Sequence, residues 1–405
     1  MAKTHVVKEP QGDRTPFLRG ILIQSLLNAG IGFEDAFRTA QQVRDELRSV
    51  AEISSSALSA RVAELLENEL GAAARAAYTA EPEPQTNIIV HTPTRSTPFS
   101  IGILAHSLET CAIPPDVAVY GARKIFASVQ QTGHTEIDHK SLRRIIYRCL
   151  KEDCDRAMAE RYLSWRRFEN SGSPLIILIG GTTGSGKSTI ASEIAYRTDI
   201  ARVQSTDMIR EIIRAYLTPD AVPTLGYSSF EAWRGLQTAT RKHDKKIARP
   251  VVAGFRSQFS AIQPALRAAL KRAVQETEDM IIEGVHVVPA QMDLDEAREA
   301  GVVVPLMLAT LDKSLLQKQL KRRGREKSER KASRHLDGLD DIWELQSYLL
   351  SDADNRGIPI IQNLDVESTV REVLALVSTK IRKRFPPQLE DIDKDSPAVV
   401  AVRES

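Results

Sequence analysis

The second half of the chain alternates short apolar runs with segments of helical periodicity. The runs that predict strands are 175–179, 201–204, 280–282, 302–308 and 358–362. Apolar residues recur three or four positions apart in the intervals and predict helices at 208–217, 229–246, 261–276 and 339–355. Strands that alternate with helices form a doubly wound parallel sheet, which binds ligands at the carboxyl ends of its strands. We therefore predict an α/β domain at 172–385 and a disordered tail at 386–405.

The first half of the chain contains an internal duplication. Residues 14–27 return as residues 96–109 with eight identities, and the match resumes two residues out of register where Ile53 corresponds to Ile137. The spacing of apolar residues predicts helices at 34–47 and 55–66 in one copy and at 115–129 and 140–150 in the other. An earlier helix would start at the Pro that follows Thr15 or Thr97, with that Thr as its cap. Two copies of one unit imply two similar, mainly helical domains, 1–78 and 88–168, joined by a Pro-containing linker.

A glycine-rich loop follows the first predicted strand of the α/β domain. Residues 180–189 read GGTTGSGKST, match G-x-x-x-x-G-K-[ST], and run into a helical pattern. This strand–loop–helix context is that of a phosphate-binding P-loop, whose backbone N–H groups and helix N-terminus surround phosphate oxygens. Lys187 would reach the β- and γ-phosphates, and the Ser188 hydroxyl would bind Mg²⁺. The predicted nucleotide contacts are Gly181, Thr182, Thr183, Gly184, Ser185, Gly186, Lys187, Ser188 and Thr189.

The predicted second strand is followed by an acid and two arginines. Asp207 stands where the strand ends and a helix begins, so its carboxylate could accept the proton of an attacking hydroxyl or simply cap the helix. Arg210 and Arg214 are four residues apart and share a helix face. They could bind an anionic substrate, or they could remain solvated.

The predicted third strand also ends in an acid. Glu283, followed by Gly284, is a candidate to hold Mg²⁺ directly or through water, and the alternative is an exposed acid at a strand end. His286 could contact a substrate phosphate, although a single histidine at a strand end is more often structural.

The segment 318–335 carries nine Lys or Arg residues against two acids. Such a block could bind nucleic acid, but it has no interleaved aromatic residues for base stacking. In a P-loop kinase it more plausibly forms a lid that closes over ATP, and part of it could be a solvated helix. The arginines that would serve such a lid are Arg322, Arg323, Arg325, Arg330 and Arg334.

The overall charge and composition favour a soluble cytoplasmic protein. A net charge of +2 does not indicate a nucleic-acid or membrane partner. The most apolar stretches are too short to span a bilayer. The three cysteines, Cys111, Cys149 and Cys154, have no metal-ligand spacing and are expected as small core residues in a reducing compartment.

Taken together, these segments resemble the 2-phosphoglycerate kinase family. The resemblance lies in residues 180–190, 205–211, 281–289, 357–363 and the arginine-rich segment up to Leu336. It implies that ATP and Mg²⁺ serve to phosphorylate the free hydroxyl of 2-phosphoglycerate, giving 2,3-bisphosphoglycerate. It implies catalytic roles for Lys187, Asp207 and Glu283, and the positions of the two acids also resemble those in uridine kinase and phosphoribulokinase. Ser188 and Glu283 would hold the metal, and the residues that would contact the acceptor are Asp207, Arg210, Arg214 and His286.

The two N-terminal units resemble ATP-cone domains, which sense adenine nucleotides. The first copy keeps a lead-in with Lys8 and Gly12, whereas the second copy, from Val90 to Thr94, lacks both residue types. The resemblance therefore implies adenine-nucleotide binding by the first copy, and packing or dimerisation by the second.

Two other kinds of function fit parts of the sequence. One is an ATP-sensing regulator that uses the basic segment to bind DNA, which leaves Asp207 without a role. The other is a kinase for another small metabolite or for a nucleoside. A nucleoside would require a pocket for its base, and the nearby candidates are Tyr227, Phe230 and Trp233, which core packing explains equally well.

Overall fold

The computed structural model divides the chain into two compact units, Met1–Thr86 and Asn87–Ser405. It describes residues 4–7, 14–17, 22–23, 25–26, 29–47, 50, 52–79, 88–92, 95–133, 135–218, 220–237, 250–327 and 334–388, with the backbone alone at 14–16, 33–34 and 322–327. Most of the predicted linker and the predicted tail beyond 388 lie outside these residues.

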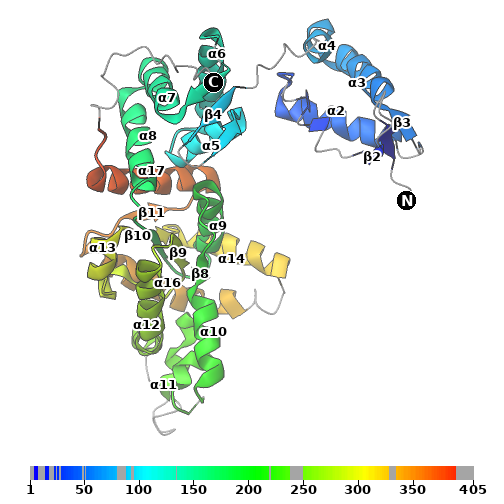
Figure 1. Cartoon of the computed structure of the whole chain (residues 1–405). Helices are drawn as coiled ribbons and strands as arrows, with labels where there is room; N and C mark the ends of the chain where they lie inside the picture. The colour runs from blue at the N-terminus through cyan, green and yellow to red at the C-terminus, as the bar shows by residue number, and fades with distance from the viewer. Residues whose placement is uncertain are drawn as a thin grey trace. The chain divides into compact units, whose positions relative to one another are not determined.

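The first unit is a small sheet with helices (Figure 1). Its central strand β1 (His5–Val7) runs antiparallel to β2 (Arg14–Pro16) and parallel to β3 (Glu52–Ser54). The helices are α2 (Phe33–Glu46), α3 (Ser55–Leu70) and α4 (Ala72–Thr79). Buried apolar side chains of α2 and α3, such as Val43 and Leu66, form a core of their own with Leu26.

The second copy of the repeat has the same sheet. Its central strand β4 (Ile89–His91) runs antiparallel to β5 (Ser96–Pro98) and parallel to β6 (Glu136–Asp138). In the first copy the central Val6 pairs with Thr15 and Ile53, and in the second Val90 pairs with Thr97 and Ile137. The sequence repeat is therefore also a structural repeat. The helices of this copy are α5 (Ile101–Thr110), α6 (Pro115–Gln131) and α7 (His139–Asp153), and α8 (Arg156–Glu169) follows.

The expected Thr–Pro helix starts are wrong in both copies. Thr15 and Thr97 lie in strands, because the backbone of each Thr–Pro pair ladders with the central strand. In the second copy the helix begins later, and Ser100 is its cap, with an oxygen that accepts the Ile103 N–H at 3.2 Å. Each copy of the repeat thus contains a three-stranded sheet, which the helical spacing of its apolar residues did not predict.

The predicted α/β fold with a parallel sheet is confirmed. Five parallel strands take the order β11-β10-β7-β9-β8, which places the strand before the P-loop at the centre. The strands are β7 (Leu175–Gly180), β8 (Val203–Ser205), β9 (Met280–Glu283), β10 (Val302–Ala309) and β11 (Ile360–Gln362).

The helices and 3₁₀ turns of this domain connect these strands. The helices are α9 (Lys187–Thr198), α10 (Thr206–Tyr216), α11 (Trp233–Gln237), α12 (Val251–Gln275), α13 (Asp295–Ala300), α14 (Lys313–Lys327), α16 (Leu339–Asp354) and α17 (Val366–Arg384). The 3₁₀ turns are η2 (Pro223–Gly226), η3 (Ser229–Glu231) and η4 (Pro289–Gln291). The helix expected at 229–246 is divided into η3 and α11, and residues 238–249 lie outside the described ranges.

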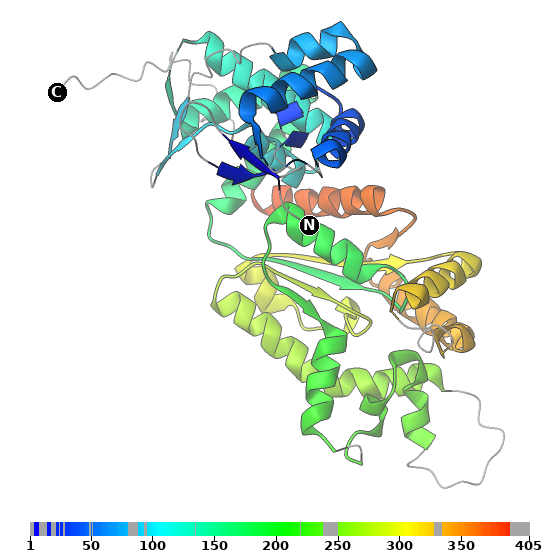
Figure 2. The same ribbon diagram turned by 90° about the vertical axis from the view of Figure 1, so that its right-hand side faces the viewer.

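Alternate residues of β7 enter two different cores, as the two-residue period of a strand requires. Ile177 and Ile179 pack in the core that contains α9 and α17. Ile176 and Leu178 pack in the core that contains α12 and α16. Figure 2 shows the green α9 and the red α17 on one side of the sheet and the yellow-green α12 on the other. The sheet is therefore buried on both faces, which explains why its central strands are apolar without alternation.

The second repeat shares a core with the α/β domain. Leu108, Ile125 and Phe168 belong to the same buried cluster as Ile177 and Val373. The Trp165 indole N–H donates to the Ser378 hydroxyl at 2.9 Å, deep in that cluster. The segments 88–168 and 172–385, which the sequence divides, thus lie in one compact unit. No helix in the described ranges is both long and apolar enough to cross a membrane.

Candidate active site

The P-loop lies at the carboxyl end of the central strand β7 and leads directly into α9. Gly186 stands before the helix with φ of 84°, a left-handed conformation that glycine adopts without strain. The helix therefore begins at Lys187, and its N-terminus carries the positive end of the helix dipole. The predicted nucleotide contacts, residues 181–189, are brought together in one loop and one helical turn.

Asn363 holds the loop from the side of β11. Its Nδ2 donates to the Ser185 carbonyl at 2.9 Å, and its Oδ1 accepts from the Thr369 hydroxyl at 3.1 Å. The side chain is buried, and a β-carbon at Gly186 would overlap its amide. The loop and Asn363 are thus in direct contact, with no room for a larger residue at position 186.

A second buried polar network holds the loop from the side of β10. The Thr182 hydroxyl lies 3.4 Å from Gln346 Oε1, which also accepts the Thr310 N–H at 3.3 Å. Gln346 Nε2 donates to the Thr310 carbonyl at 3.0 Å. All three residues are buried, so the amide of Gln346 fixes the loop relative to the end of β10.

The Lys187 side chain is buried against the loop. Its Nζ donates to the Thr182 carbonyl at 2.6 Å and lies 3.4 Å from Ser185 Oγ. A buried ammonium group is costly unless polar atoms surround it, and here loop atoms do so. The arrangement places a positive charge at the loop, where a P-loop lysine meets the phosphates of a nucleotide.

Ser188, in the first turn of α9, lies beside Glu283, the last residue of β9. The Ser188 hydroxyl donates to Glu283 Oε1 at 3.0 Å, and Glu283 pairs with Ile179 in the sheet and is buried. Mg²⁺ prefers oxygen ligands and is usually held by one or two protein groups together with phosphates and waters. The described residues contain no cluster of three or more His, Cys, Asp or Glu that could hold a metal ion. The pair therefore fits Mg²⁺ that binds together with nucleotide phosphates.

Asp207 lies in the first turn of α10, directly after β8. Ser205 pairs with Glu283, so Asp207 follows closely on the same edge of the sheet. The helix cap position is Ser205, not Asp207. Asp207 is exposed, and its carboxylate has no hydrogen-bond partner within the described part of the chain. Capping therefore does not explain this carboxylate.

Arg210 and Arg214 flank one carboxylate. Arg210 donates to the Tyr227 carbonyl and to Glu211 Oε1, the latter at 2.8 Å, while Arg214 pairs with Glu211 Oε2 at 2.6 Å. The Arg210 side chain is 14% exposed and that of Arg214 is 48% exposed. The structure thus brings both arginines together, and Arg214 is the more accessible to an anion.

His286 lies in the core beneath the strand end. Its side chain is fully buried, with Nε2 2.8 Å from Gln258 Oε1 and Nδ1 3.3 Å from the Thr206 hydroxyl. Burial lowers the pKa of His286 to about 3, against a smaller opposing effect of the Asp207 carboxylate. His286 is therefore neutral and inaccessible, unlike the exposed Asp207 and Arg214.

The basic segment is described only in part. Arg322, Arg323 and Arg325 fall on α14, where the structure describes the backbone alone, and Arg330 lies outside the described residues. Arg334 donates to Glu231 Oε2 at 2.6 Å, and Arg234 pairs with the other oxygen of this buried carboxylate at 3.2 Å.

The helix that carries most of the basic segment rests on the P-loop. A β-carbon at Gly184 would overlap Leu316 and Leu320 of α14. Both leucines are buried, so the start of α14 is packed against the loop through apolar contacts.

Three buried residues that contact the site or its supports were missed from sequence: Asn363, Gln346 and Gln258. Asn363 directly follows β11, and a polar residue at the carboxyl end of a parallel strand is a usable signal. Gln346 and Gln258 are polar residues on the apolar faces of α16 and α12. Only the interruption of an apolar face indicated them.

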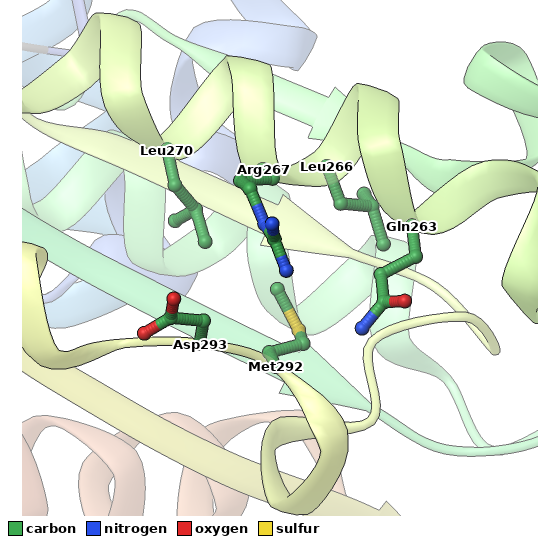
Figure 3. Close-up of a pocket in the computed structure, with 6 residues that line it drawn as sticks. All are labelled: Gln263, Leu266, Arg267, Leu270, Met292 and Asp293. Carbon is green, nitrogen blue, oxygen red and sulfur yellow. The ribbon is translucent and has the colours of Figure 1, made fainter.

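A small cavity lies elsewhere, between α12 and the loop after η4 (Figure 3). Its volume of about 10 Å³ suits a single water molecule. Its lining includes Arg267 and Asp293 and no residue of the P-loop, β9 or α10.

Comparison with known proteins agrees with the geometry. The model of the Zeta toxin family matches residues 159–243. A 2-phosphoglycerate kinase of Pyrococcus horikoshii is 37% identical over 285 residues, which cover 70% of this chain and 91% of the relative. The corresponding values for the Pyrococcus furiosus enzyme are 35%, 70% and 90%, and those for the Methanopyrus kandleri enzyme are 35%, 71% and 85%. The chain belongs to the 2-phosphoglycerate kinase family.

Proposed function

We propose that this protein transfers the γ-phosphoryl group of ATP to the free hydroxyl of 2-phosphoglycerate, giving 2,3-bisphosphoglycerate. The observation that carries the proposal is the convergence of three groups at one edge of the sheet. The P-loop with Lys187 follows β7, Glu283 ends β9 beside Ser188, and Asp207 follows β8. A nucleotide-binding loop, a metal-binding pair and a carboxylate free to accept a proton are the parts that phosphoryl transfer requires.

Each group has a defined role in this proposal. Lys187 and the loop amides hold the β- and γ-phosphates, and Ser188 and Glu283 hold Mg²⁺, which offsets phosphate charge when bound. Asp207 accepts the proton of the acceptor hydroxyl as that oxygen attacks phosphorus. Because the protein does little covalent chemistry in such a transfer, positioning and charge stabilisation supply most of the rate.

The acceptor is a small anionic metabolite, and the arginines suit it. An acceptor that carries both a phosphate and a carboxylate is repelled by ATP, so cationic side chains must offset that repulsion. Arg210 lies one turn of α10 beyond Asp207 and Arg214 two turns beyond it, and both are positioned to bind the acceptor phosphate or carboxylate after separating from Glu211. Arginines of the basic segment, among them Arg322, Arg323 and Arg325, would close over the nucleotide as a lid.

His286 is assigned no acceptor contact in this proposal. Its two ring nitrogens are both engaged within the core, and its buried position separates it from a ligand. For a nucleoside kinase, a base pocket lined by aromatic rings would be needed. Phe230 is fully buried and the Trp233 N–H donates to Asp341 at 3.2 Å, so packing accounts for both rings.

The test is ADP release by the purified full chain with Mg-ATP and each of several acceptors. We expect turnover with 2-phosphoglycerate, and none with 3-phosphoglycerate, glycerate or nucleosides. Lys187→Ala should abolish turnover, whereas Lys271→Ala, on the exposed face of α12, should not change it. Turnover with a different acceptor alone would make the protein a kinase of another metabolite. ATP binding without turnover would favour an ATP-sensing regulator.

We also infer that the first N-terminal unit binds an adenine nucleotide. We expect the protein to act in the cytoplasm, where ATP is supplied. Lys8 and Gly12 lie outside the described residues, so the support is the repeat and its resemblance to ATP-cones. Calorimetry on Lys187→Ala should reveal a remaining ATP site that Lys8→Ala removes. No remaining site, or one that survives Lys8→Ala, would contradict the inference. We expect no nucleic-acid or membrane partner, and the second copy of the repeat could serve to form a homo-oligomer.

A further inference from the structure

A series of buried hydrogen bonds connects the start of α10 with the turn at η2, next to the Tyr227 carbonyl to which Arg210 donates. Gln258 Nε2 lies 2.6 Å from the Thr224 carbonyl and 3.0 Å from the Tyr227 carbonyl. Gln258 Oε1 lies 2.8 Å from His286 Nε2, and His286 Nδ1 lies 3.3 Å from Thr206 Oγ1. Thr206, Gln258 and His286 are fully buried, so no water competes for these bonds.

The direction of each bond in this series can be derived. A carbonyl cannot donate, so the amide nitrogen of Gln258 must be the atom that faces the two backbone carbonyls. The amide oxygen of Gln258 is therefore an acceptor, and His286 Nε2 carries the proton that it accepts. Because the buried ring is neutral, Nδ1 has a lone pair, and the Thr206 hydroxyl donates to it. One tautomer of His286 satisfies every partner.

Two contacts make this series a support for α10. Thr206 lies so close to Gly284 that a β-carbon there would overlap its hydroxyl, and Gly284 has φ of 148°. The first residue of α10 is therefore held directly on the end of β9. One turn later, Arg210 donates to the Tyr227 carbonyl, which also accepts a hydrogen bond from Gln258 Nε2. The helix is fixed at Thr206 and at Arg210, and Asp207 lies between them.

We propose that Thr206, His286 and Gln258 form a positioning relay. The relay holds Asp207 and Arg210 beside Glu283, at the end of β9, in the arrangement that phosphoryl transfer to the acceptor requires. None of the three relay residues touches a substrate. The relay spans α10, the loop after β9, α12 and the turn at η2, so it joins the elements that carry the acceptor groups to the strand that carries the metal group. Phe255 stacks on the His286 ring, with centroids 5.7 Å apart and planes at 18°, and holds the ring in this orientation.

The main test is Thr206→Val, which keeps the shape and removes the donor hydroxyl. The relay rests on the proposed function, so turnover of 2-phosphoglycerate by the unaltered protein is measured first. We expect kcat to fall on the order of 10- to 100-fold, because a small displacement of a catalytic group has effects of that size. The KM for ATP and the ATP-binding stoichiometry should not change, whereas partial unfolding would lower the stoichiometry. Thr206→Ser should restore kcat, and Thr379→Val, on the exposed face of α17, should not alter it.

A pair of His286 variants tests the relay from its centre. His286→Asn keeps an acceptor near the Nδ1 position, and His286→Gln keeps a donor near the Nε2 position. Because the Thr206 bond sets α10, Asn should retain more kcat than Gln. The relay is refuted by wild-type kcat in Thr206→Val. It is also refuted if both His286 variants keep the wild-type kcat, since Asp207 would then be in position without the ring.

A measurement without turnover separates this proposal from the proposed function. Nitrogen-15 NMR of the full chain labelled at histidine reports which ring nitrogen of His286 carries the proton, and His286→Asn identifies the signal. The relay requires the Nε2–H tautomer. The Nδ1–H tautomer would overturn the relay even if the protein phosphorylates 2-phosphoglycerate. Absence of turnover would refute the proposed function, and the tautomer of His286 would still decide whether the relay exists.

Discussion

Asn363→Ala tests whether the P-loop depends on the side chain that holds it from β11. The substitution removes the amide that donates to the Ser185 carbonyl at 2.9 Å and accepts from the Thr369 hydroxyl at 3.1 Å. The backbone N–H of Asn363, which donates to the Ala309 carbonyl at 3.0 Å, is unaffected, so strand β11 should keep its end.

The expected loss of stability follows from these two bonds. Each contributes about 1 kcal/mol net, and a buried carbonyl left without a donor costs about 1–3 kcal/mol. Thr369 retains a second acceptor, the Asp365 carbonyl at 2.6 Å, so its hydroxyl is not stranded. The Ser185 carbonyl therefore dominates, and we expect the free energy of unfolding to fall by about 2–3 kcal/mol.

Tryptophan fluorescence in urea measures this change in the relevant unit. The three tryptophans, Trp165, Trp233 and Trp343, all lie in the larger unit, so the signal does not report on residues 1–86. Asn355→Ala, at an exposed helix end, is the matched control and should stay within about 0.5 kcal/mol of the unaltered protein. An unchanged urea midpoint for Asn363→Ala would refute the view that this amide stabilises the loop.

Three further outcomes are expected from the same structure. Glu283→Gln should raise the Mg²⁺ concentration needed for half-maximal turnover on the order of tenfold or more, since even an outer-shell metal partner has effects of this size; an unchanged Mg²⁺ dependence would remove Glu283 from the metal site. Gly284→Ala should destabilise the larger unit by about 2–6 kcal/mol in urea, because its φ of 148° is strained for alanine and the added β-carbon would overlap the Thr206 hydroxyl; equal stability would show that the turn relaxes. His286 has a folded pKa of about 3, below its unfolded value, so the unfolded chain binds the extra proton between these values. Stability should therefore fall as pH drops below about 6.5, by about 1.4 kcal/mol per unit, and fall less steeply in His286→Asn; equal slopes would contradict the buried neutral state.

The parts of the site that were predictable from sequence are those that repeat a known local pattern. The P-loop needs glycines and Lys187 at fixed spacing, and an apolar strand before it, so residues adjacent in sequence specify the geometry. Glu283 and Asp207 were placed on one edge because both follow strands of a parallel sheet. The order of the strands, which brings Ser205 opposite Glu283, depends on long-range pairing that no local pattern contains.

The role of His286 could not be predicted from sequence. Its environment is created by Gln258 from α12 and Thr206 from α10, far apart in sequence. A histidine after a strand looks the same whether it faces a ligand or the core. The small sheets of the two repeats were missed for a different reason. Their strands are three residues long, too short for a two-residue period to be distinguished from chance.

The core that joins the second repeat to the α/β domain determines where the chain can be divided. A fragment that begins at residue 87 keeps every side chain of that core, from Leu104 to Ile381. A fragment that begins at the P-loop strand loses α8, so Ser378 loses its Trp165 partner and the part of α17 that packs on α8 becomes exposed. The second copy thus belongs to the same folding unit as the P-loop, and its removal should unfold that unit, whereas the first copy has a core of its own.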